Sequence, residues 1–409
     1  MNTPKIRFKG FEDDWEQRKL GEIYGSIGNA FVGTATPYYV DQGHFYLESN
    51  NVKDGQINHN SEIFINDEFY EKQRDKWLHA GDMVMVQSGH VGHAAVIPKE
   101  LDNTAAHALI MFRNAKEKIE PYFLNYEYQT DKTKKKIENI TTGNTIKHIL
   151  ASDMQEFEVD IPKYEEQKII AGYFRTIDHL ITLHQCKCDE TKELKKFMLQ
   201  KMFPKNGEKN PEIRFEGFTD DWEQRKLSDC AEFRRGSFPQ PYGNKDWYDG
   251  KGAMPFVQVA DVSSDMKLVN DTKQKISKLA QPMSVFAEKG SVLVTLQGSI
   301  GRVAITQYGA FVDRTVLIFD KYKDDIDKKF WAYIIKEKFE YEAKKAPGGT
   351  IKTITKEVLA NFDLMLPCYA EQSILADYLI KLDHLITLHQ RKCEKLKELK
   401  KFMLQNMFV

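Results

Sequence analysis

Cysteine is scarce in this chain and its spacing is unsuitable for cross-linking. The five cysteines are an odd number, and no two of them stand in a CxxC spacing. This argues against a disulfide framework and against a structural zinc site. Cys186 and Cys188 form the only close pair, and in a helix positions i and i+2 point to different faces. We therefore expect the cysteines to pack against apolar neighbours.

Long hydrophobic runs are also missing. No segment approaches the roughly 18 to 20 consecutive apolar residues that a membrane span needs. The N-terminus runs directly into charged residues and lacks the apolar core of a signal peptide. These features predict a cytoplasmic protein with no membrane contact.

Neither sign of charge dominates, because 59 basic residues stand against 60 acidic ones. A chain of this balance has no global attraction to a polyanion, so any contact with nucleic acid must come from local groups or from partner proteins.

Three catalytic signatures are absent. The sequence contains no Asn/Asp-Pro-Pro-Phe/Tyr methyltransferase motif, no GxGxxG and no GxxxxGK[ST]. Neither a methyl donor nor ATP has an evident binding loop, which predicts a chain without catalysis of its own.

The dominant feature that is present is an internal duplication. PKIRFKGFEDDWEQRKL at 4–20 recurs at 211–227 with 14 of 17 positions identical. DHLITLHQCKCDETKELKKFMLQKMF at 178–203 recurs at 383–408 with 21 of 26 identical. A period near 205 residues gives each copy the length of a complete domain. The residues between these blocks diverge, so two variable modules alternate with two constant segments.

The constant segment from 165 to 203 contains no proline and predicts one long helix. Its apolar residues alternate at spacings of three and four, which is typical of a coiled-coil seam. Two equivalent helices most simply pack as an antiparallel pair related by a pseudo-two-fold axis. The predicted seam consists of Phe174, Ile177, Ile181, His184, Cys188, Thr191, Lys195, Met198 and Met202, with Leu379, Leu382, Ile386, His389, Cys393, Leu396, Lys400, Met403 and Met407 in the second copy.

A basic stretch accompanies each helix. It comprises Lys192, Lys195, Lys196 and Lys201 in the first copy and Lys397, Lys400 and Lys401 in the second. These lysines either follow a phosphate backbone or form a solvated face, and the sequence leaves both interpretations open.

The variable modules read as compact, strand-rich α+β domains. The first has strands expected at 43–47, 62–65, 83–86, 94–97 and 108–112, followed by a helix at 120–140. The second has strands expected at 255–259, 291–295, 303–306 and 316–319, followed by a helix at 327–346.

Three landmarks recur in both modules: a Glu/Gln-led turn, a Gly-x-x-Gly turn and a Gly-x-Thr-Ile-Lys turn. We interpret the glycines mainly as structural turns, and the polar residues beside them as candidates for reading DNA bases or binding phosphate. His107 and Arg314 are taken as corresponding positions that differ. The candidate DNA-binding residues are Asn50, Asn51, Lys53, Ser88, His90, His93, His107, Asn144, Lys147, Gln258, Ser299, Arg302, Arg314, Thr350 and Lys352.

The chain resembles the specificity subunit (HsdS) of Type I restriction-modification systems in four features. These are the alternation of divergent and constant regions, the IRFxGFxxDWEQRKL opening, the Gly-x-Thr-Ile-Lys turn, and the segment IPKYEEQ at 161–167 with its copy LPCYAEQ at 366–372. The resemblance covers essentially the whole chain. It implies two target recognition domains, each reading one half of a bipartite site on double-stranded DNA, and a helix pair that sets the spacer.

The resemblance also implies partners. Two modification subunits methylate adenine with S-adenosylmethionine, and restriction subunits driven by ATP and Mg join them, so this chain itself is expected to bind no cofactor or metal. Lys163, Lys168 and Arg175 become Cys368, Ser373 and Ile380 in the second copy, so the two partner contacts need not be equivalent. The residues expected to bind partners are Phe174, Ile177, Ile181, Leu379, Leu382 and Ile386.

The predicted architecture is therefore α+β, with two strand-rich target recognition domains joined by two long antiparallel coiled-coil helices. The segments are an N-terminal constant segment (1–20), a first recognition domain (21–150), a central conserved region with a long helix (151–210), a second recognition domain that opens with the repeated segment (211–365), and a C-terminal conserved region with a long helix (366–409).

Three alternatives compete with this prediction. A recognition domain fused to a methyltransferase would need the missing motifs on the same chain. A metal or general-base site built from His90, His93 and His107 would leave the second module inactive, because Ser299, Arg302 and Arg314 are not metal ligands. A structural coiled-coil adaptor would bind no defined DNA sequence.

Overall fold

The computed structural model describes residues 3–143, 147–205, 207–345 and 356–409. The chain divides into two compact units, one of Met1–Gln185 with Gln390–Val409 and the other of Cys186–His389. Each unit thus combines one variable module with a part of both long helices. The first unit therefore includes residues from both ends of the chain.

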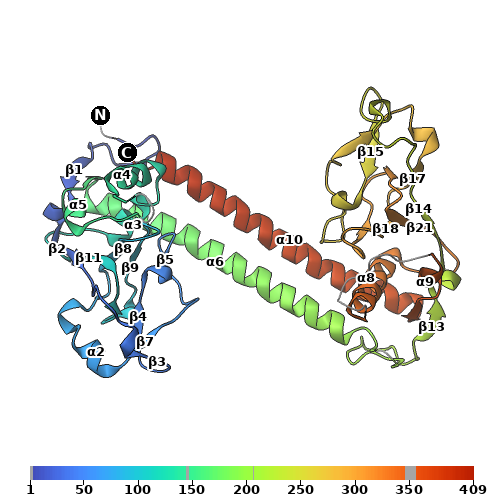
Figure 1. Cartoon of the computed structure of the whole chain (residues 1–409), viewed down its shortest axis with the longest axis horizontal. Helices are drawn as coiled ribbons and strands as arrows, with labels where there is room; N and C mark the ends of the chain where they lie inside the picture. Colours follow the sequence, from blue (N-terminus) through green and yellow to red (C-terminus); the bar gives the residue numbers. More distant parts are fainter. Residues whose placement is uncertain (1–2, 144–146, 206, 346–355) are drawn as a thin grey trace. The chain divides into compact units, whose positions relative to one another are not determined.

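Two four-stranded sheets form the module of the first unit (Figure 1). One sheet, in the order β2-β11-β8-β9, is antiparallel throughout, and the other, β10-β4-β7-β3, contains the parallel pair β10 and β4. Its strands are β2 (Tyr24–Asn29), β3 (Tyr39–Val40), β4 (His44–Leu47), β7 (Phe64–Ile65), β8 (Met83–Val86), β9 (Ala94–Val96), β10 (Ala105–Ala106) and β11 (Leu109–Ala115), and β5 (Val52–Lys53) pairs separately with β6 (Gln56–Ile57). Its helices are α1 (Leu20–Ile23), α2 (Asp67–Glu71), α3 (Pro121–Glu127), α4 (Asp131–Ile140) and α5 (Ala151–Gln155).

The module of the second unit repeats this plan. Its sheets run β14-β21-β18-β19 and β16-β15-β20-β17, and β15 and β20 are again a parallel pair. The strands are β14 (Ala231–Arg235), β15 (Met254–Val257), β16 (Gln274–Ile276), β17 (Val285–Ala287), β18 (Val292–Thr295), β19 (Val303–Ile305), β20 (Ala310–Val312) and β21 (Val316–Tyr322). The helices are α7 (Leu227–Cys230), α8 (Lys328–Lys345) and α9 (Lys356–Ala360).

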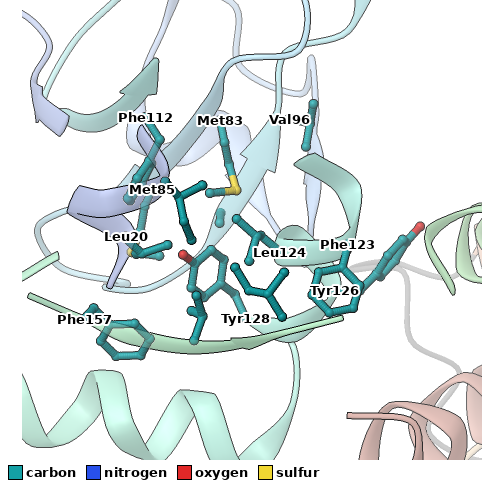
Figure 2. Packing of buried hydrophobic residues seen from close by; sticks show 14 of the residues in the cluster. Leu20, Met83, Met85, Val96, Phe112, Phe123, Leu124, Tyr126, Tyr128 and Phe157 are labelled. Atoms are coloured by element: carbon teal, nitrogen blue, oxygen red, sulfur yellow. The ribbon is translucent and has the colours of Figure 1, made fainter. Parts of the chain in front are cut away.

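The central strand β8 explains why a short apolar run predicts a strand here. All four of its residues are buried, and successive side chains point to opposite faces of the sheet. Met83 and Met85 join the larger core, whereas Val84 and Val86 join a smaller one on the other face. Figure 2 shows Met83 and Met85 beside Leu124, with side chains from the sheet and from α3 meeting in one core.

The constant opening segment of each repeat contacts the residues at the start of a long helix. β1 (Glu16–Lys19) pairs with β12 (Glu158–Ile161), and β13 (Glu223–Lys226) pairs with β22 (Asp363–Leu366). Arg7 forms an ion pair with Glu166 at 2.7 Å, and Arg214 repeats it with Glu371 at 2.7 Å. The opening segment of each repeat therefore contacts the strand before the long helix of the same repeat and the first turn of that helix.

The two long helices are α6 (Tyr164–Lys201) and α10 (Tyr369–Asn406), and they pack in antiparallel fashion within each unit. In the first unit Phe174 meets Phe408, Asp178 meets Lys400 and Gln185 meets Cys393, so the contacts run in opposite directions along the two helices. The second unit repeats the pattern, with Cys188 against Ile386 and Lys195 against Asp383. The antiparallel pairing and the α+β class are as predicted.

One predicted element divides in two. The helix expected at 120–140 is α3 and α4, separated at 128–130, because the Thr130 side chain caps a new helix by accepting a hydrogen bond from the Thr133 N–H at 3.2 Å. In the second module the expected helix at 327–346 is the single helix α8. Among the described residues, no helix is long and apolar enough to cross a membrane.

Candidate nucleic-acid interface

A glycine turn follows β8 in the first unit. Gly89 and Gly92 have φ of 79° and 86°, values that favour glycine. The Gly92 N–H donates to the Val86 carbonyl at 3.1 Å, which closes the turn. A Cβ on Gly92 would lie 2.9 Å from a side-chain carbon of Ile137 in α4. Gly92 is thus required by both conformation and packing, which supports the structural interpretation of this glycine.

The second unit builds the same turn after β18. Gly298 and Gly301 have φ of 67° and 81°, and the Gly301 N–H donates to the Thr295 carbonyl at 2.9 Å. A Cβ on Gly301 would lie 2.9 Å from the Cβ of Phe339 in α8. The two turns therefore have the same backbone conformation, which we call the backbone frame, and each packs against the equivalent helix of its module.

The side chains on this frame differ between the units. His90 and Ser299 are exposed at equivalent points of the two turns, and His93 of the first unit corresponds to the exposed Arg302 of the second. Two modules with one frame and different exposed polar groups can present different hydrogen-bonding patterns to base edges.

The structure brings the three landmarks of the first module together. The Gly89 N–H donates to the Lys147 carbonyl at 3.1 Å, which joins the glycine turn to the Gly-x-Thr-Ile-Lys turn. The Asp54 N–H, directly after the first landmark, donates to Nδ1 of His93 at 3.2 Å. The sequence spacing alone does not reveal this convergence.

His93 is held as a directed hydrogen-bond donor. Burial lowers the pKa of its imidazole and so favours the neutral ring, although the nearby Asp54 carboxylate has the opposite, smaller effect. Since Nδ1 accepts the Asp54 N–H, the proton of the neutral ring lies on Nε2. The ring of His90 lies beside it, with centroids 6.4 Å apart.

Asn51 has a structural role, which corrects its assignment as a DNA contact. Its side chain is buried, with the amide oxygen accepting the Glu48 N–H at 3.0 Å and the amide nitrogen donating to the carbonyls of Asn58 and Ser61. The buried Asp261 accepts the Gln258 N–H in the same way in the second unit. Both residues stabilise the landmark turn from within.

His107 is also committed internally. One ring nitrogen is 3.2 Å from a Glu48 carboxylate oxygen and the other is 3.0 Å from the Gly33 carbonyl oxygen, so neither is available to DNA. Its assumed correspondence to Arg314 is wrong by one residue. The His107 N–H donates to Leu47 at the end of β4, whereas Asp313 makes the equivalent bond to Val257 of β15.

Most other candidates are accessible. Asn50, Lys53, Ser299, Arg302 and Arg314 are exposed, and Ser88, Lys147 and Gln258 are partly or largely accessible. Lys147 forms an ion pair with Glu138 at 2.6 Å, and the Arg314 guanidinium lies 5.3 Å from the ring centre of Tyr242. The predicted residues Asn144, Thr350 and Lys352 lie outside the described residues.

The histidine metal site finds no support in the described part of the chain. No group of three or more His, Cys, Asp or Glu side chains there could hold a metal ion. His107 is hydrogen-bonded elsewhere, and His90 and His93 have no third ligand among the residues that the structure describes.

A three-residue contact ties each module to both helices of its unit. Asp178 of α6 accepts the Tyr126 hydroxyl at 2.8 Å and pairs with Lys400 of α10 at 2.7 Å. In the second unit Asp383 accepts the Tyr333 hydroxyl at 2.5 Å and pairs with Lys195 at 2.6 Å. Neither lysine is therefore free for phosphate, and both fix the register of the helix pair.

The predicted seam lies inside the molecule. Phe174, Ile177, Leu379 and Leu382 are buried in the cores of their units, and Ile181 is partly buried against the core. Ile386 contributes its carbonyl to the Cys188 contact. Side chains covered by their own chain have little surface left for a partner, so burial argues against partner binding by the first four of these residues, whereas for the partly exposed Ile181 and Ile386 it stays a prediction.

A different set of apolar residues on the helices is exposed. If the seam positions of each heptad are written a and d, most of the exposed apolar residues lie at c and g on one side of each helix. Eight of them occur in identical pairs related by the repeat: Ile169 and Ile374, Leu183 and Leu388, Leu194 and Leu399, and Phe197 and Phe402. Tyr369 and Leu385 are exposed in the second copy only. Asp178 and Asp383, which hold the modules, are at e, so the apolar side faces away from that contact.

We define two apolar stripes from these residues. The first stripe, in the first unit, consists of Ile169, Leu183, Leu399 and Phe402, and the second stripe, in the second unit, consists of Leu194, Phe197, Ile374 and Leu388. Phe197 is 46% exposed and Phe402 is 56% exposed. Exposed apolar residues that recur along one side of a helix often mark a protein interface.

Comparison with known proteins agrees with the geometry. The model of the Type I restriction modification DNA specificity domain matches residues 12–193 and again 219–398. A putative type I restriction enzyme MjaX specificity subunit of Methanocaldococcus jannaschii is 24% identical, covering 98% of this chain and 94% of the relative. The MjaVIII specificity subunit of the same organism is 21% identical, covering 95% and 91%.

Solved structures share the fold. The S subunit of a Type I system from M. genitalium superposes with a TM-score of 0.65 at 13% identity, covering 100% of this chain and 99% of that one. A structure described for complex assembly and conformational transition of the type I R-M system gives 0.53 at 18% identity, covering 98% and 99%. With the family model matching both repeats, the chain belongs to the family of Type I restriction-modification DNA specificity subunits.

Proposed function

We propose that each module of this specificity subunit reads one half of a bipartite DNA site, and that the chain directs adenine methylation and restriction by partner subunits. The observation that carries the proposal is the duplicated turn, which presents His90 and His93 in one unit and Ser299 and Arg302 in the other on the same backbone frame. One frame with two sets of polar groups suits two unlike half-sites.

The exposed and partly exposed polar residues of the landmark turns form the proposed base-reading surface. In the first unit they are Asn50, Lys53, Ser88, His90, His93 and Lys147, and in the second unit they are Gln258, Ser299, Arg302 and Arg314. Asn51 and His107 support these loops and make no DNA contact in this proposal.

Two modification subunits dock on the two apolar stripes. The stripes carry identical residues because the helices are duplicated, so both suit the same kind of partner, although flanking residues such as Lys168 and Ser373 differ between the two surfaces. This accounts for two copies of one partner on a single chain. Restriction subunits join the assembly through those partners.

The chain itself is proposed to be non-catalytic. S-adenosylmethionine, ATP and Mg are bound by the partners, consistent with the absence of their sequence motifs here. Within the complex the chain supplies recognition and spacing.

The decisive experiment exchanges residues 21–150 for the corresponding module of another family member and maps methylated adenines in genomic DNA. We expect a two-part motif with a fixed gap, of which the exchange alters one half only. A change in both halves would refute one-module-one-half recognition. Methylation without any sequence motif would instead favour a structural adaptor.

A further inference from the structure

A surface groove of about 680 Å³ in the first unit joins the glycine turn to the constant helix α10. The turn at 89–93 and helix α4 form part of its wall, and Lys397 and Lys401 near the end of α10 form another part. Figure 1 shows α4 close to the C-terminal end of α10, and Lys132 of α4 donates to the carbonyl of Val409 at 2.7 Å. A residue of the variable module and a residue of the constant helix can therefore contact one ligand there.

The lysines of α10 are not equivalent. Lys400 points inward and is bound to Asp178, with only 14% of its side chain exposed. Lys397 and Lys401 are exposed and have no ion pair with any carboxylate in the described part of the chain. They are four residues apart, so they lie on one face, roughly 5 to 6 Å from each other at Cβ.

The groove as a whole is basic, because five lysines line it against three carboxylates. Lys134 of α4 also lines it and is likewise without an ion pair among the described residues. The Glu138 carboxylate forms an exposed ion pair with Lys147 at 2.6 Å, and the Asp54 carboxylate lies 3.8 Å from the neutral ring of His93. The Asp131 carboxylate lines the groove without such a partner in the ion pairs of the described chain.

We propose that Lys397 and Lys401 bind the DNA phosphate backbone beside the half-site that the His90 turn reads, with Lys134 contributing from the module. This inference rests on the proposed function and extends the DNA interface from the variable module to the constant helix. Phosphate contacts carry no sequence information, so they serve any module that replaces the present one.

The second unit does not share this arrangement in full. Lys192 and Lys196 are the repeats of Lys397 and Lys401, but they lie 3.1 Å and 3.8 Å from the carboxylates of Asp189 and Glu193. These exposed pairs are weak, yet they offset the positive charge locally. We therefore assign the phosphate contact to the first unit.

The test compares Lys397→Ala/Lys401→Ala with the parent, each assembled with its modification subunits. Binding to DNA that carries the mapped site and to scrambled DNA is measured by fluorescence anisotropy over a range of KCl concentrations. We expect affinity for both DNAs to fall by a similar factor. The slope of log K against log salt should decrease by about 1 to 2, which corresponds to one or two lost phosphate contacts.

The control removes two exposed lysines of the same unit that do not line the groove, as Lys9→Ala/Lys99→Ala, and should leave the slope unchanged. An unchanged slope in the Lys397/Lys401 variant would overturn the inference. So would a loss of preference for the mapped site at constant slope, which indicates base reading, or a failure to assemble, which indicates a partner contact.

The inference and the proposed function fail differently. If the parent complex binds mapped and scrambled DNA equally, the recognition proposal fails whatever the slope shows. If the parent discriminates and only the slope comparison fails, the modules still read DNA and the constant helix makes no phosphate contact.

Discussion

Glu127 is a carboxyl group buried at a position where the second unit carries an apolar side chain. It follows Tyr126, whose hydrogen bond to Asp178 is repeated by Tyr333, so its counterpart is the buried Ile334. The neighbouring Asp160 of β12 pairs with Gln17 across the two strands. In the second unit the equivalent Gln224 pairs with Met365, so the second unit has an apolar residue in place of this carboxylate too.

Burial, and to a lesser degree the Asp160 carboxylate, raises the pKa of the Glu127 carboxyl from 4.5 to about 8. Below pH 4.5 the group is protonated in both the folded and the unfolded chain, so it does not affect stability through ionisation. Between these two values the unfolded chain releases its proton while the folded chain keeps it. The free energy of unfolding therefore falls by about 1.4 kcal/mol for each pH unit.

At pH 7, about 2.5 units above the unfolded value, the accumulated loss is about 3 kcal/mol. Glu127→Gln removes the ionisable group and keeps the shape, so it should stabilise the first unit by about this amount at pH 7 and by less than about 1 kcal/mol at pH 5. The free energy of unfolding of each variant is measured by urea denaturation at both pH values. Pulse proteolysis, with detection of peptides from the first unit, reports the unfolded fraction of that unit.

A matched control is Glu100→Gln, because Glu100 is exposed and should respond at neither pH. Equal stability of parent and Glu127→Gln at pH 7, or a change of the same size at both pH values, would refute the reasoning. The first outcome would mean that the folded chain ionises Glu127 without penalty, and the second would mean that the amide acts through packing.

Two further predictions concern the helices. Lys195→Met leaves Asp383 partly buried without its cation and should destabilise the second unit by about 3 kcal/mol, whereas Lys195→Met/Asp383→Asn should cost less and exposed Lys196→Met almost nothing. A double-mutant cycle from urea unfolding checks this, and equal losses in the single and double variants would contradict it. Leu399→Glu/Phe402→Glu should reduce the modification subunits bound per chain from two to one in native mass spectrometry, while Arg391→Ala/Glu398→Ala on the same helix should retain two. Retention of both subunits by the Glu variant would exclude the first stripe as a docking surface.

The sequence by itself determined the duplication, the two long helices with their seam, and the strand-rich modules. These follow from local periodicity and from repeated blocks, which need no knowledge of distant contacts. It also placed the glycine turns correctly, because in each module a Gly-x-x-Gly spacing stands between two short apolar runs that form the paired strands β8 and β9 or β18 and β19.

Only the tertiary structure decided which polar residues face outward. Asn51 and His107 have the composition of base-reading residues, yet their side chains satisfy backbone and carboxylate groups inside the module. Lys400 and Lys401 are adjacent in sequence and alike in chemistry, but a partner on another helix holds the first and leaves the second exposed. Hydrogen-bond satisfaction and burial are properties of contacts between segments distant in sequence, so no local pattern of residues could have separated these roles.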